Sequence, residues 1–232
     1  MKLQEERAYT NHDTGLLGIF ACIFMFIDHA GVLFFPYASW IRAVGRLALP
    51  LFAWGIAIGA HHTRNIYKYA LRLFVMIMIS QPFYMYALNH SLTRLNIFAT
   101  LFLGLIAILG IKEKKEYITI IALLLAQLLD MDYGLRGVLC VLLLYVLRDQ
   151  PFWLSICFSA YCVIWGQNSM VIQRTPWFSI RLQTCAIFAL PFMLYPRSKR
   201  TRTPRWLMYA AYPGHLAIYW LILQLFTFRT LP

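Results

Sequence analysis

The sequence predicts an all-α integral membrane protein, a polytopic bundle of about nine transmembrane helices with a range of eight to ten. The composition supports this class, because 61% of the 232 residues are hydrophobic and only 13% are charged, unlike a soluble domain. Several apolar runs approach the roughly 20 residues that cross a bilayer. We find no internal repeat and no low-complexity segment, so one transmembrane domain is expected.

Apolar segments carry the predicted helices, and polar or turn-forming residues separate them. We expect spans at 15–35, 40–60, 69–88, 95–111, 117–130, 134–147, 152–167, 180–196 and 206–228. Residues 1–14 are expected to form a cytoplasmic tail without a signal-peptide cleavage pattern, and 15–228 to form the membrane domain. Several segments are short for a full crossing, which a bundle accommodates by packing them against neighbours.

The net charge of +12 lies mostly in the connections between apolar segments. About twice as many Lys and Arg residues flank the helix ends on the side of the amino terminus as flank the other ends. The positive-inside rule then places the amino terminus in the cytoplasm and the carboxy terminus outside. Because topology accounts for these cations, nucleic acid is not an expected partner.

The cysteines lie inside apolar runs, and their spacing matches no metal-binding pattern. They are Cys22, Cys140, Cys157, Cys162 and Cys185. The sequence also contains no Walker loop, zinc motif, nucleophile elbow or dinucleotide fingerprint. We therefore predict no metal site and interpret the cysteines as small core residues.

Two polar residues, Asp28 and His29, interrupt the first apolar helix in "FMFIDHAGVLFF". An Asp at the centre of a membrane helix costs roughly 2.5–3.5 kcal/mol, so it requires a partner or a function. His29 lies about 21 Å along the helix from Gly15, in the outer third of the membrane. Arg46 of the second helix reaches the same depth, with Arg42 one turn nearer the surface. An Asp28–Arg46 ion pair is predicted, either within a functional site or only to fix helix packing.

The face of the first helix below His29 carries the small residues Cys22 and Gly18. Such a stripe indicates either close helix packing or a slot that leads from the cytoplasm to the imidazole. In the last helix, "YAAYPGHLAIYWLI", Pro213 leaves a carbonyl free and His215 follows at mid-depth. His215 either lines a cavity or is a core histidine bonded to that free backbone.

Weaker signals flank these helices. Asn96 and Asp132 precede helices at the outer side, and Asp132 is either a site residue or a helix cap. Arg64, Lys68 and Arg72 follow the second helix on the cytoplasmic side. They either obey the positive-inside rule or bind phosphate groups.

Several motifs are specific in combination and in order. They are "FMFIDHAG", "RAVGRLALPLFAWGIAIGAHHTRN", "YALRLFVMIMISQP", "NIFATLFLGL", "DYGLRGVLCVLLLY" and "YPGHLAIYWLI". Over about residues 15–225 the chain resembles the TraX family, named for the enzyme that acetylates the amino terminus of F-type conjugative pilin. That family is similar to a wider group of transmembrane acyltransferases, including bacterial enzymes that O-acetylate the envelope and the lysosomal heparan-glucosaminide acetyltransferase.

The resemblance implies a membrane-embedded acetyltransferase that moves acetyl from cytoplasmic acetyl-CoA to an amine or hydroxyl acceptor at the outer side of the membrane. By position, the DH pair of the family matches Asp28 and His29, its GR-x-x-x-P arginine matches Arg46, and its late histidine matches His215. Gly18 departs from the pattern, because relatives often carry Lys or Arg there.

We predict that His29 is the general base, because imidazole suits proton transfer near neutral pH. The paired charges of Asp28 and Arg46 would keep the electrostatic field around His29 fixed. Arg46 or Asn96 would face the oxyanion that develops during the reaction. No acyl-enzyme residue is evident, so direct transfer is favoured. The predicted site residues are His29, Asp28 and Arg46 for catalysis, Gly18, Cys22, Arg64, Lys68 and Arg72 for the donor, and Arg42, Asn96, Asp132 and His215 as further candidates.

The expected location is the bacterial cytoplasmic (inner) membrane, where the multi-pass chain contacts the lipid bilayer. The acceptor stays open between a pilin amino terminus, another peptide amine and an envelope sugar. A homodimer is suggested only by analogy with other transmembrane acyltransferases. Two other classes compete with the enzyme: a transporter or flippase that uses the same polar core, and a non-catalytic partner of a secretion or conjugation machine.

Overall fold

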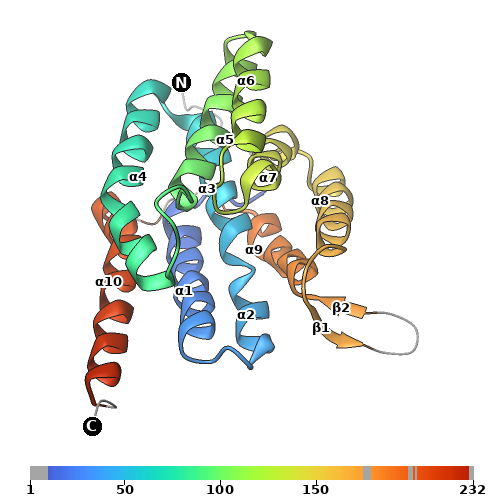
Figure 1. Ribbon diagram of the computed structural model, residues 1–232. Coiled ribbons are helices and arrows are strands. Elements are labelled where there is room, and N and C mark those ends of the chain that lie inside the picture. The colour runs from blue at the N-terminus through green and yellow to red at the C-terminus, as the bar shows by residue number, and fades with distance from the viewer. Residues whose placement is uncertain (1–9, 175–178, 198–200, 202, 230–232) are drawn as a thin grey trace.

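The computed structural model describes residues 10–174, 179–197, 201 and 203–229, and it is built almost entirely of helices (Figure 1). The predicted all-helical class is therefore confirmed. The predicted tail is described only from Thr10 onward, and Lys199, Arg200 and Arg202 of the predicted cationic loop lie outside the described residues.

The elements follow one another along the chain with short connections. The first eight helices are α1 (Thr14–Leu33), α2 (Ser39–Gly45), α3 (Ala48–His62), α4 (Ile66–Leu88), α5 (Ile97–Lys112), α6 (Glu116–Leu128), α7 (Gly134–Leu147) and α8 (Pro151–Gly166). An antiparallel hairpin, β1 (Val171–Arg174) and β2 (Ser179–Arg181), precedes the 3₁₀ helix η1 (Leu182–Ala189), α9 (Leu190–Leu194) and α10 (Arg205–Arg229).

The predicted span 40–60 is broken into α2 and α3, and Arg46 lies at the break. Pro50 has no N–H to donate to the carbonyl of Arg46, which weakens a continuous helix at this point. The backbone tightens instead: the Arg46 N–H donates to Arg42 O at 3.1 Å and the Leu47 N–H donates to Val44 O at 3.3 Å. The break presents Arg46 at the end of a short helix rather than on a continuous helix face.

The predicted span 180–196 also differs from the structure. Its first residues belong to β2, the next form η1, and α-helix is confined to α9. The Arg181 guanidinium donates to the carbonyls of Gln167 (2.5 Å) and Ser169 (3.2 Å) and ties this region to the end of α8. Other predictions agree closely with the structure, and 134–147 coincides with α7.

Among the described residues, three helical segments are long and apolar enough to cross a membrane: α1, Ser39–His62, which joins α2 and α3, and α4. The helices α5 to α7 have 16, 13 and 14 residues. At 1.5 Å per residue they reach about 20–24 Å, less than the roughly 30 Å of a hydrocarbon core. The membrane character is thus supported, whereas the nine spans and their orientation stay predictions.

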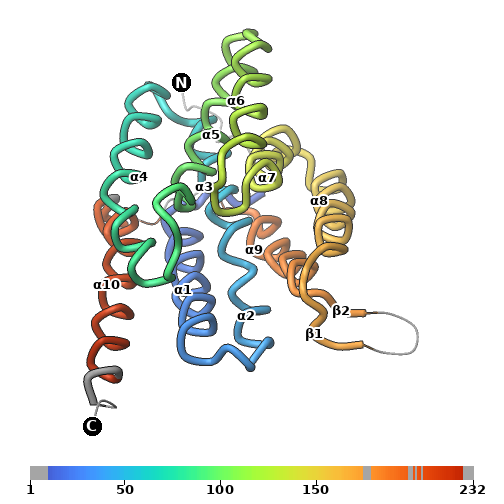
Figure 2. The backbone as a smooth tube through the Cα atoms, in the orientation of Figure 1, coloured from blue at the N-terminus to red at the C-terminus, as the bar shows by residue number. Residues whose placement is uncertain are grey.

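The centre of the bundle is α3, which packs against α1, α5 and α7. Its Trp54 is fully buried. Close approach of the α2–α3 segment to α1 depends on Gly45, because an added Cβ there would lie 2.3 Å from the Cβ of Asp28. At the far end of the chain, α10 returns to lie beside α4 (Figure 2).

We call the end of the bundle where α1 and α4 begin and α3 ends the upper end, as in Figure 1. Here the chain before α1 is inserted into the protein. Asn11 accepts a hydrogen bond from Trp54 Nε1 at its carbonyl (2.7 Å) and donates one to Phe192 O (2.9 Å). Asp13 is fully buried and caps α1 by accepting from the Leu16 N–H at 3.1 Å.

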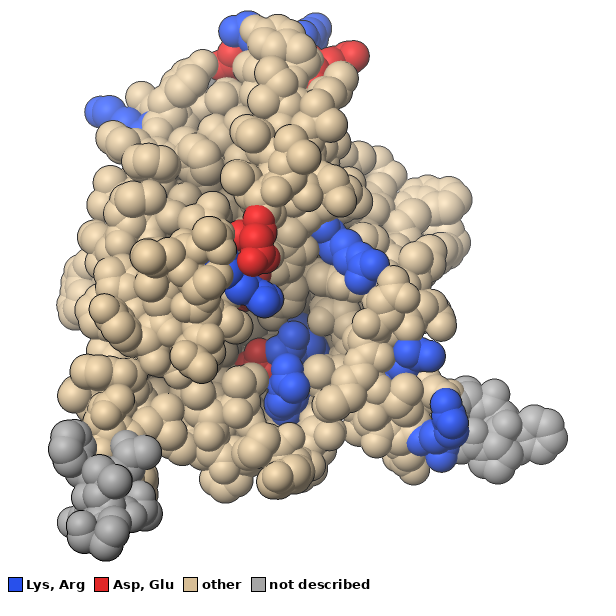
Figure 3. Space-filling model, viewed as in Figure 1, with Lys and Arg blue, Asp and Glu red and all other residues tan. Residues whose placement is uncertain are grey.

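Two connections meet deeper in the molecule, between α4 and α5 and between α6 and α7. The Leu95 N–H donates to Asp130 O, and the Asp132 N–H donates to Leu95 O, both at 2.9 Å. Residues of the second connection border a depression of about 490 Å³, and Figure 3 shows charges of both signs gathered in a hollow in the middle of this face. Non-helical backbone at membrane depth is tolerated where it lines such a polar space.

Candidate active site

Asp28 and Arg46 form the predicted ion pair between α1 and the α2–α3 break. Both side chains are close to fully buried, at 9% and 11% exposure. Arg46 Nη2 bonds Asp28 Oδ2, while Asp28 Oδ1 and Arg46 Nε are buried without a hydrogen-bond partner among the described residues. The pair is therefore only partly satisfied, which is unusual for buried charges.

His29 pairs with His215 of α10 rather than with its neighbour Asp28. Nδ1 of His29 lies 2.6 Å from Nε2 of His215. The planes of the two rings lie 9° from parallel, with centroids 4.9 Å apart. His215 is buried, and its Nδ1 lies 2.7 Å from the carbonyl oxygen of Ala211 one turn earlier.

The backbone contact fixes the protons of this histidine pair in its neutral form. A carbonyl oxygen only accepts, so Nδ1 of His215 carries a proton and Nε2 of His215 is an acceptor. Nδ1 of His29 must then donate to Nε2 of His215, which leaves the lone pair of His29 on its own Nε2. The hydrogen-bond chain from Ala211 through His215 thus prepares one nitrogen of half-buried His29 as a base.

A second group of charges lies close to this ion pair. Arg94 Nη2 is 3.9 Å from Asp132 Oδ1, and the Arg46 guanidinium carbon lies 5.9 Å from the ring centroid of Tyr133. Asp132 does not cap the following helix as one interpretation expected, because Tyr133 occupies that position and α7 begins without a side-chain cap. Arg42 packs its stem against Gly31 of α1.

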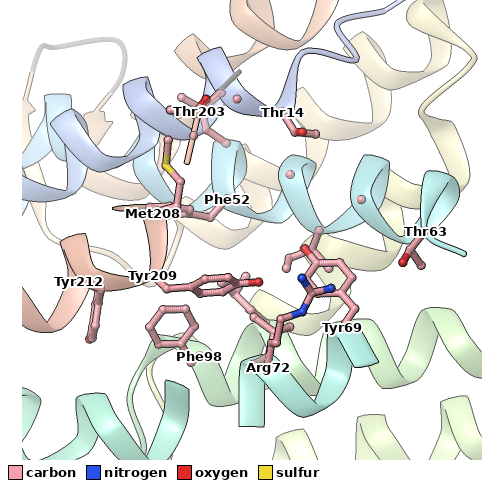
Figure 4. A pocket seen from close by; sticks show the side chains of 18 of the residues that line it. Thr14, Phe52, Thr63, Tyr69, Arg72, Phe98, Thr203, Met208, Tyr209 and Tyr212 are labelled. Atoms are coloured by element: carbon pink, nitrogen blue, oxygen red, sulfur yellow. The ribbon is translucent and has the colours of Figure 1, made fainter. Parts of the chain in front are cut away.

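A cavity of about 420 Å³ runs inward from the upper end of the bundle (Figure 4). Thr14, Thr63 and Arg72 line it near the helix ends, and Tyr212 lines it deep in the protein. The ring of Tyr212 is 6.1 Å from that of His29 and 5.7 Å from that of His215. The cavity therefore leads from the upper end to Tyr212, which lies beside the histidine pair, while His29 and His215 themselves do not line it.

Glycines shape the wall of this cavity. Its lining residues include Gly15, Gly18, Gly55 and Gly59. An added Cβ at Gly55 would meet no atom within 4 Å, whereas one at Gly18 would lie 3.0 Å from Met208 Sδ. Gly55 therefore faces open space, and Gly18 leaves room for a flexible methionine. Of the slot predicted below His29, Gly18 lines this cavity, whereas Cys22 and His29 do not.

The predicted donor-binding residues have different positions relative to this cavity. Gly18 and Arg72 line it, and buried Cys22 lies behind Met208, with 3.8 Å between the two sulfur atoms. Arg72 lies 5.6 Å from the ring centroid of Tyr69, which also lines the cavity. Arg64 and Lys68 are exposed and do not line it.

Asn96 is fully buried, and its amide is already used in folding. Its Nδ2 donates to Ile77 O and Gln81 Oε1, both at 2.9 Å, and its Oδ1 accepts from the Phe98 N–H at 3.0 Å. Asn96 therefore caps α5 and joins it to α4.

Comparison with known proteins places this arrangement in a family. The family model described as TraX protein matches residues 14–223. The chain belongs to the TraX family. It is also 28% identical over 224 residues to the probable fimbrial assembly protein FimC, serogroup H1, of Dichelobacter nodosus, with 87% of this chain and 92% of the relative covered. No solved structure matches.

This member of the family also has site features that the sequence interpretation missed. Tyr212 lies three residues before His215, so the two share a face of α10, and this spacing was a usable signal. Gly55 shares the sequence stretch that carries Arg46, but nothing in that stretch alone places it in a cavity wall. The burial of Asp13 depends on chain segments far away in the sequence.

Proposed function

We propose that this protein is a membrane-embedded acetyltransferase that takes acetyl from acetyl-CoA and passes it to an amine or hydroxyl acceptor, with His29 as general base. The observation that carries the proposal is the hydrogen-bonded histidine pair, which lies beside Tyr212 at the inner end of a cavity. Its hydrogen bonds leave His29 with one basic nitrogen, and the cavity gives a donor a route toward it. The TraX and fimbrial assembly relatives support a role near pilin or related surface proteins.

The proposed chemistry needs two proton transfers, one from the acceptor to His29 and one from His29 to the departing CoA thiolate. Nε2 of His29 takes the proton of the acceptor amine or hydroxyl as its nitrogen or oxygen attacks the thioester carbonyl carbon. When the tetrahedral intermediate collapses, the C–S bond breaks and the CoA thiolate takes the proton from His29. His215 steadies the imidazolium between these steps through the same hydrogen bond.

In this proposal the Asp28–Arg46 pair sets the electrostatic field beside the base. Arg46 is held at the helix break, where its charge favours negative charge that develops nearby. The other interpretation, that the pair only fixes packing, also fits its burial and the close approach at Gly45. The unpartnered oxygen of Asp28 favours a functional role.

The donor is proposed to enter from the upper end, which is the cytoplasmic end in the predicted topology. Arg72 is the best-placed of the predicted donor-binding cations, since it lines the cavity where a nucleotide phosphate would remain. The thin pantetheine arm would extend along Gly18 and Gly55 toward Tyr212. Arg64 and Lys68 would act only at longer range from the exposed surface.

The acceptor is proposed to approach from the side of the charged hollow. Its charged residues suit a polar acceptor better than a lipid tail. A pilin amino terminus is the acceptor that the family name favours, and another peptide amine or an envelope sugar remains an alternative. A homodimer stays a prediction by analogy.

A transporter or flippase is the second candidate, because a cavity and a charged hollow in one helical bundle also suit passage of a substrate. The two functions differ in their dependence on acetyl-CoA. A transporter moves its substrate without the thioester, whereas the proposed enzyme consumes it.

The deciding experiment measures acetyl-CoA binding to detergent-purified protein by calorimetry, together with release of free CoA thiol in the presence of a peptide amine. We expect wild type to bind and turn over, His29→Ala to bind without turnover, and Arg72→Ala to bind about 10-fold more weakly, as loss of one phosphate contact predicts. Arg174→Ala, an exposed arginine on β1, serves as the control. If folded wild type binds neither acetyl-CoA nor CoA, the acetyltransferase proposal is wrong and the transporter is favoured.

A further inference from the structure

The cavity at the upper end of the bundle has an accessible arginine in its wall. Arg72 is the one Lys or Arg among the described residues that line it, and its side chain is exposed. Its Nε donates to the carbonyl of Lys68 one turn earlier at 3.1 Å, which turns the guanidinium back toward the upper end. No ion pair within the described chain uses its Nη atoms. The guanidinium can therefore bind an anion in the bidentate way that suits a phosphate group.

The contact between Gly59 and Tyr69 shows how deep this arginine lies. A Cβ added at Gly59 would lie 3.1 Å from the Tyr69 ring, and the Arg72 guanidinium carbon is 5.6 Å from the centroid of that ring. The guanidinium therefore lies near the level of Gly59. The lining continues inward along α3 to Leu51, about 12 Å at 1.5 Å per residue, and outward to Thr63, about 6 Å.

Below the level of Arg72 the cavity is apolar and bounded on one side by glycine. Gly55 lines it, and an added Cβ there would meet no atom within 4 Å. Figure 4 shows Tyr209 of α10 pointing toward Arg72 and Tyr69, so the polar atoms gather above this apolar part. The remaining lining of the inner part is formed by Leu51, Phe52, Ile56, Leu73, Ile97, Phe98 and Leu101. Such a space suits a thin chain that ends in a charged group.

The arm of CoA has the length that this cavity requires. About 13 bonds separate its sulfur from its first phosphorus, which spans about 15 Å when extended, at ~3.5 Å for every three bonds. With the sulfur at the level of Leu51, the first phosphate lies between the levels of Gly59 and Thr63. That is the part of the cavity where Arg72 lies. The second phosphate and the adenosine then lie at or beyond the rim.

We propose that the cavity recognises the 4′-phosphopantetheine part of CoA, with Arg72 on its phosphate, and that the adenosine stays outside. This inference rests on the proposed acetyltransferase function, and it names the donor class as thioesters of phosphopantetheine. Arg64 and Lys68 are exposed and do not line the cavity. Solvent and salt screen charges at such positions, so they add little specificity for the 3′-phosphate on the adenosine.

The first test measures which part of CoA wild type recognises. Calorimetry on the detergent-purified protein compares CoA, dephospho-CoA without the 3′-phosphate, 4′-phosphopantetheine without the adenosine, and pantetheine without any phosphate. We expect the first three to bind within about fivefold of one another, because they share the arm and its phosphate. Pantetheine should bind about 10-fold more weakly than phosphopantetheine, as loss of one charge-assisted phosphate contact predicts.

A variant of Arg72 then assigns the phosphate contact. Arg72→Ala should weaken phosphopantetheine about 10-fold and leave pantetheine within about twofold, so that the two ligands bind alike. CoA and dephospho-CoA should weaken by the same factor as phosphopantetheine. Arg174→Ala is the matched control, since Arg174 of β1 is exposed and does not line the cavity. It should change none of the four affinities.

The outcomes separate this inference from the function on which it rests. If wild type binds CoA but binds phosphopantetheine more than about 100-fold more weakly, the adenosine is recognised, the inference is wrong and the acetyltransferase proposal stands. If Arg72→Ala weakens phosphopantetheine and pantetheine equally, Arg72 does not bind the phosphate and the inference is also wrong. If folded wild type binds neither CoA nor acetyl-CoA, both proposals are wrong. The comparison of the four ligands uses wild type alone, so it does not depend on the folding of a variant.

Discussion

Asp13 and Asp28 are both buried acidic residues on the same stretch of chain, yet their oxygens are satisfied very differently. Asp13 accepts from the Thr201 N–H at 2.8 Å and the Thr201 hydroxyl at 2.6 Å, and it also pairs with Arg197 at 3.1 Å. Asp28 bonds Arg46 through one oxygen, and its other oxygen has no partner among the described residues. Contacts within the fold therefore supply partners for both oxygens of Asp13 but for only one oxygen of Asp28.

The same contrast separates Asn96, the residue before α5, from Tyr212 of α10. Asn96 uses both ends of its amide in helix capping and helix packing, whereas the hydroxyl proton of Tyr212 has no acceptor among the described residues. Buried polar groups without partners are rare in native proteins and indicate ligands, catalysis or water. The comparison therefore separates polar groups that the fold satisfies, at Asp13 and Asn96, from groups that it leaves without a full set of partners, at Asp28 and Tyr212.

The largest effect is expected at His29. His29→Ala removes the proposed base, and loss of general base catalysis lowers turnover by about 10²–10⁴. Affinity for acetyl-CoA should change by less than threefold, because the imidazole acts on the acceptor proton. The measurement is single-turnover CoA release beside calorimetric binding, with His61→Ala, an exposed histidine at the end of α3, as control. Normal turnover by a folded His29→Ala protein would remove His29 from the chemistry.

The Asp28–Arg46 pair comes next. Asp28→Asn leaves the Arg46 charge buried without compensation, which costs about 3–5 kcal/mol of unfolding free energy. The double variant Asp28→Asn with Arg46→Met removes both charges and should recover most of that loss. Both variants should still be inactive. The measurement is denaturant or thermal unfolding in detergent, paired with acetyl transfer.

The double variant decides between the two interpretations of the pair. If it recovers stability and also activity, the pair serves packing alone. If it recovers stability without activity, the charges themselves are needed for the reaction.

The sequence predicted the Asp28–Arg46 pair because two charges at matching depth on consecutive helices each need a partner. It also predicted helix α7 to the residue. The helix break at Arg46 was missed, although Pro50 gave a local signal for it. The ring contact between Tyr212 of α10 and Phe98 of α5 could not be predicted, because it joins two helices that are distant in sequence.

A side chain that fills the cavity should block the proposed route of acetyl-CoA, and we expect an effect of intermediate size on its affinity. Gly55→Leu places a side chain in space where no atom lies within 4 Å of an added Cβ. We expect affinity for acetyl-CoA to fall by about 10–100-fold, as blocking of a preformed pocket predicts, while the unfolding temperature is kept. Gly104→Leu is the contrasting variant, because an added Cβ there would already lie 2.9 Å from Val141. It should lower stability instead. Unchanged affinity in Gly55→Leu would place the donor elsewhere.

The smallest expected effect is on the stability of the fold, and it depends on pH through the buried carboxylate of Asp13. Burial alone would raise the pKa of Asp13, but hydrogen bonds from Thr201 and Leu16 and the charge of Arg197 outweigh it and hold the pKa below its ordinary value of 3.8. Because the folded-state pKa is lowered, Asp13 stabilises the fold above pH 3.8. That contribution is lost as the pH falls through the folded-state pKa.

The Asp13→Asn variant makes this pH dependence measurable. We expect it to be less stable than wild type by about 1–3 kcal/mol near pH 7, the usual cost of weakening hydrogen bonds to a buried charge. The difference should shrink when unfolding is measured below about pH 4. Asp149→Asn is the control, since Asp149 is 51% exposed and pairs only at the surface. A difference between Asp13→Asn and wild type that is independent of pH would mean that the carboxylate charge is not what holds the start of α1, and Asp13 would then no longer serve as the satisfied counterpart of Asp28.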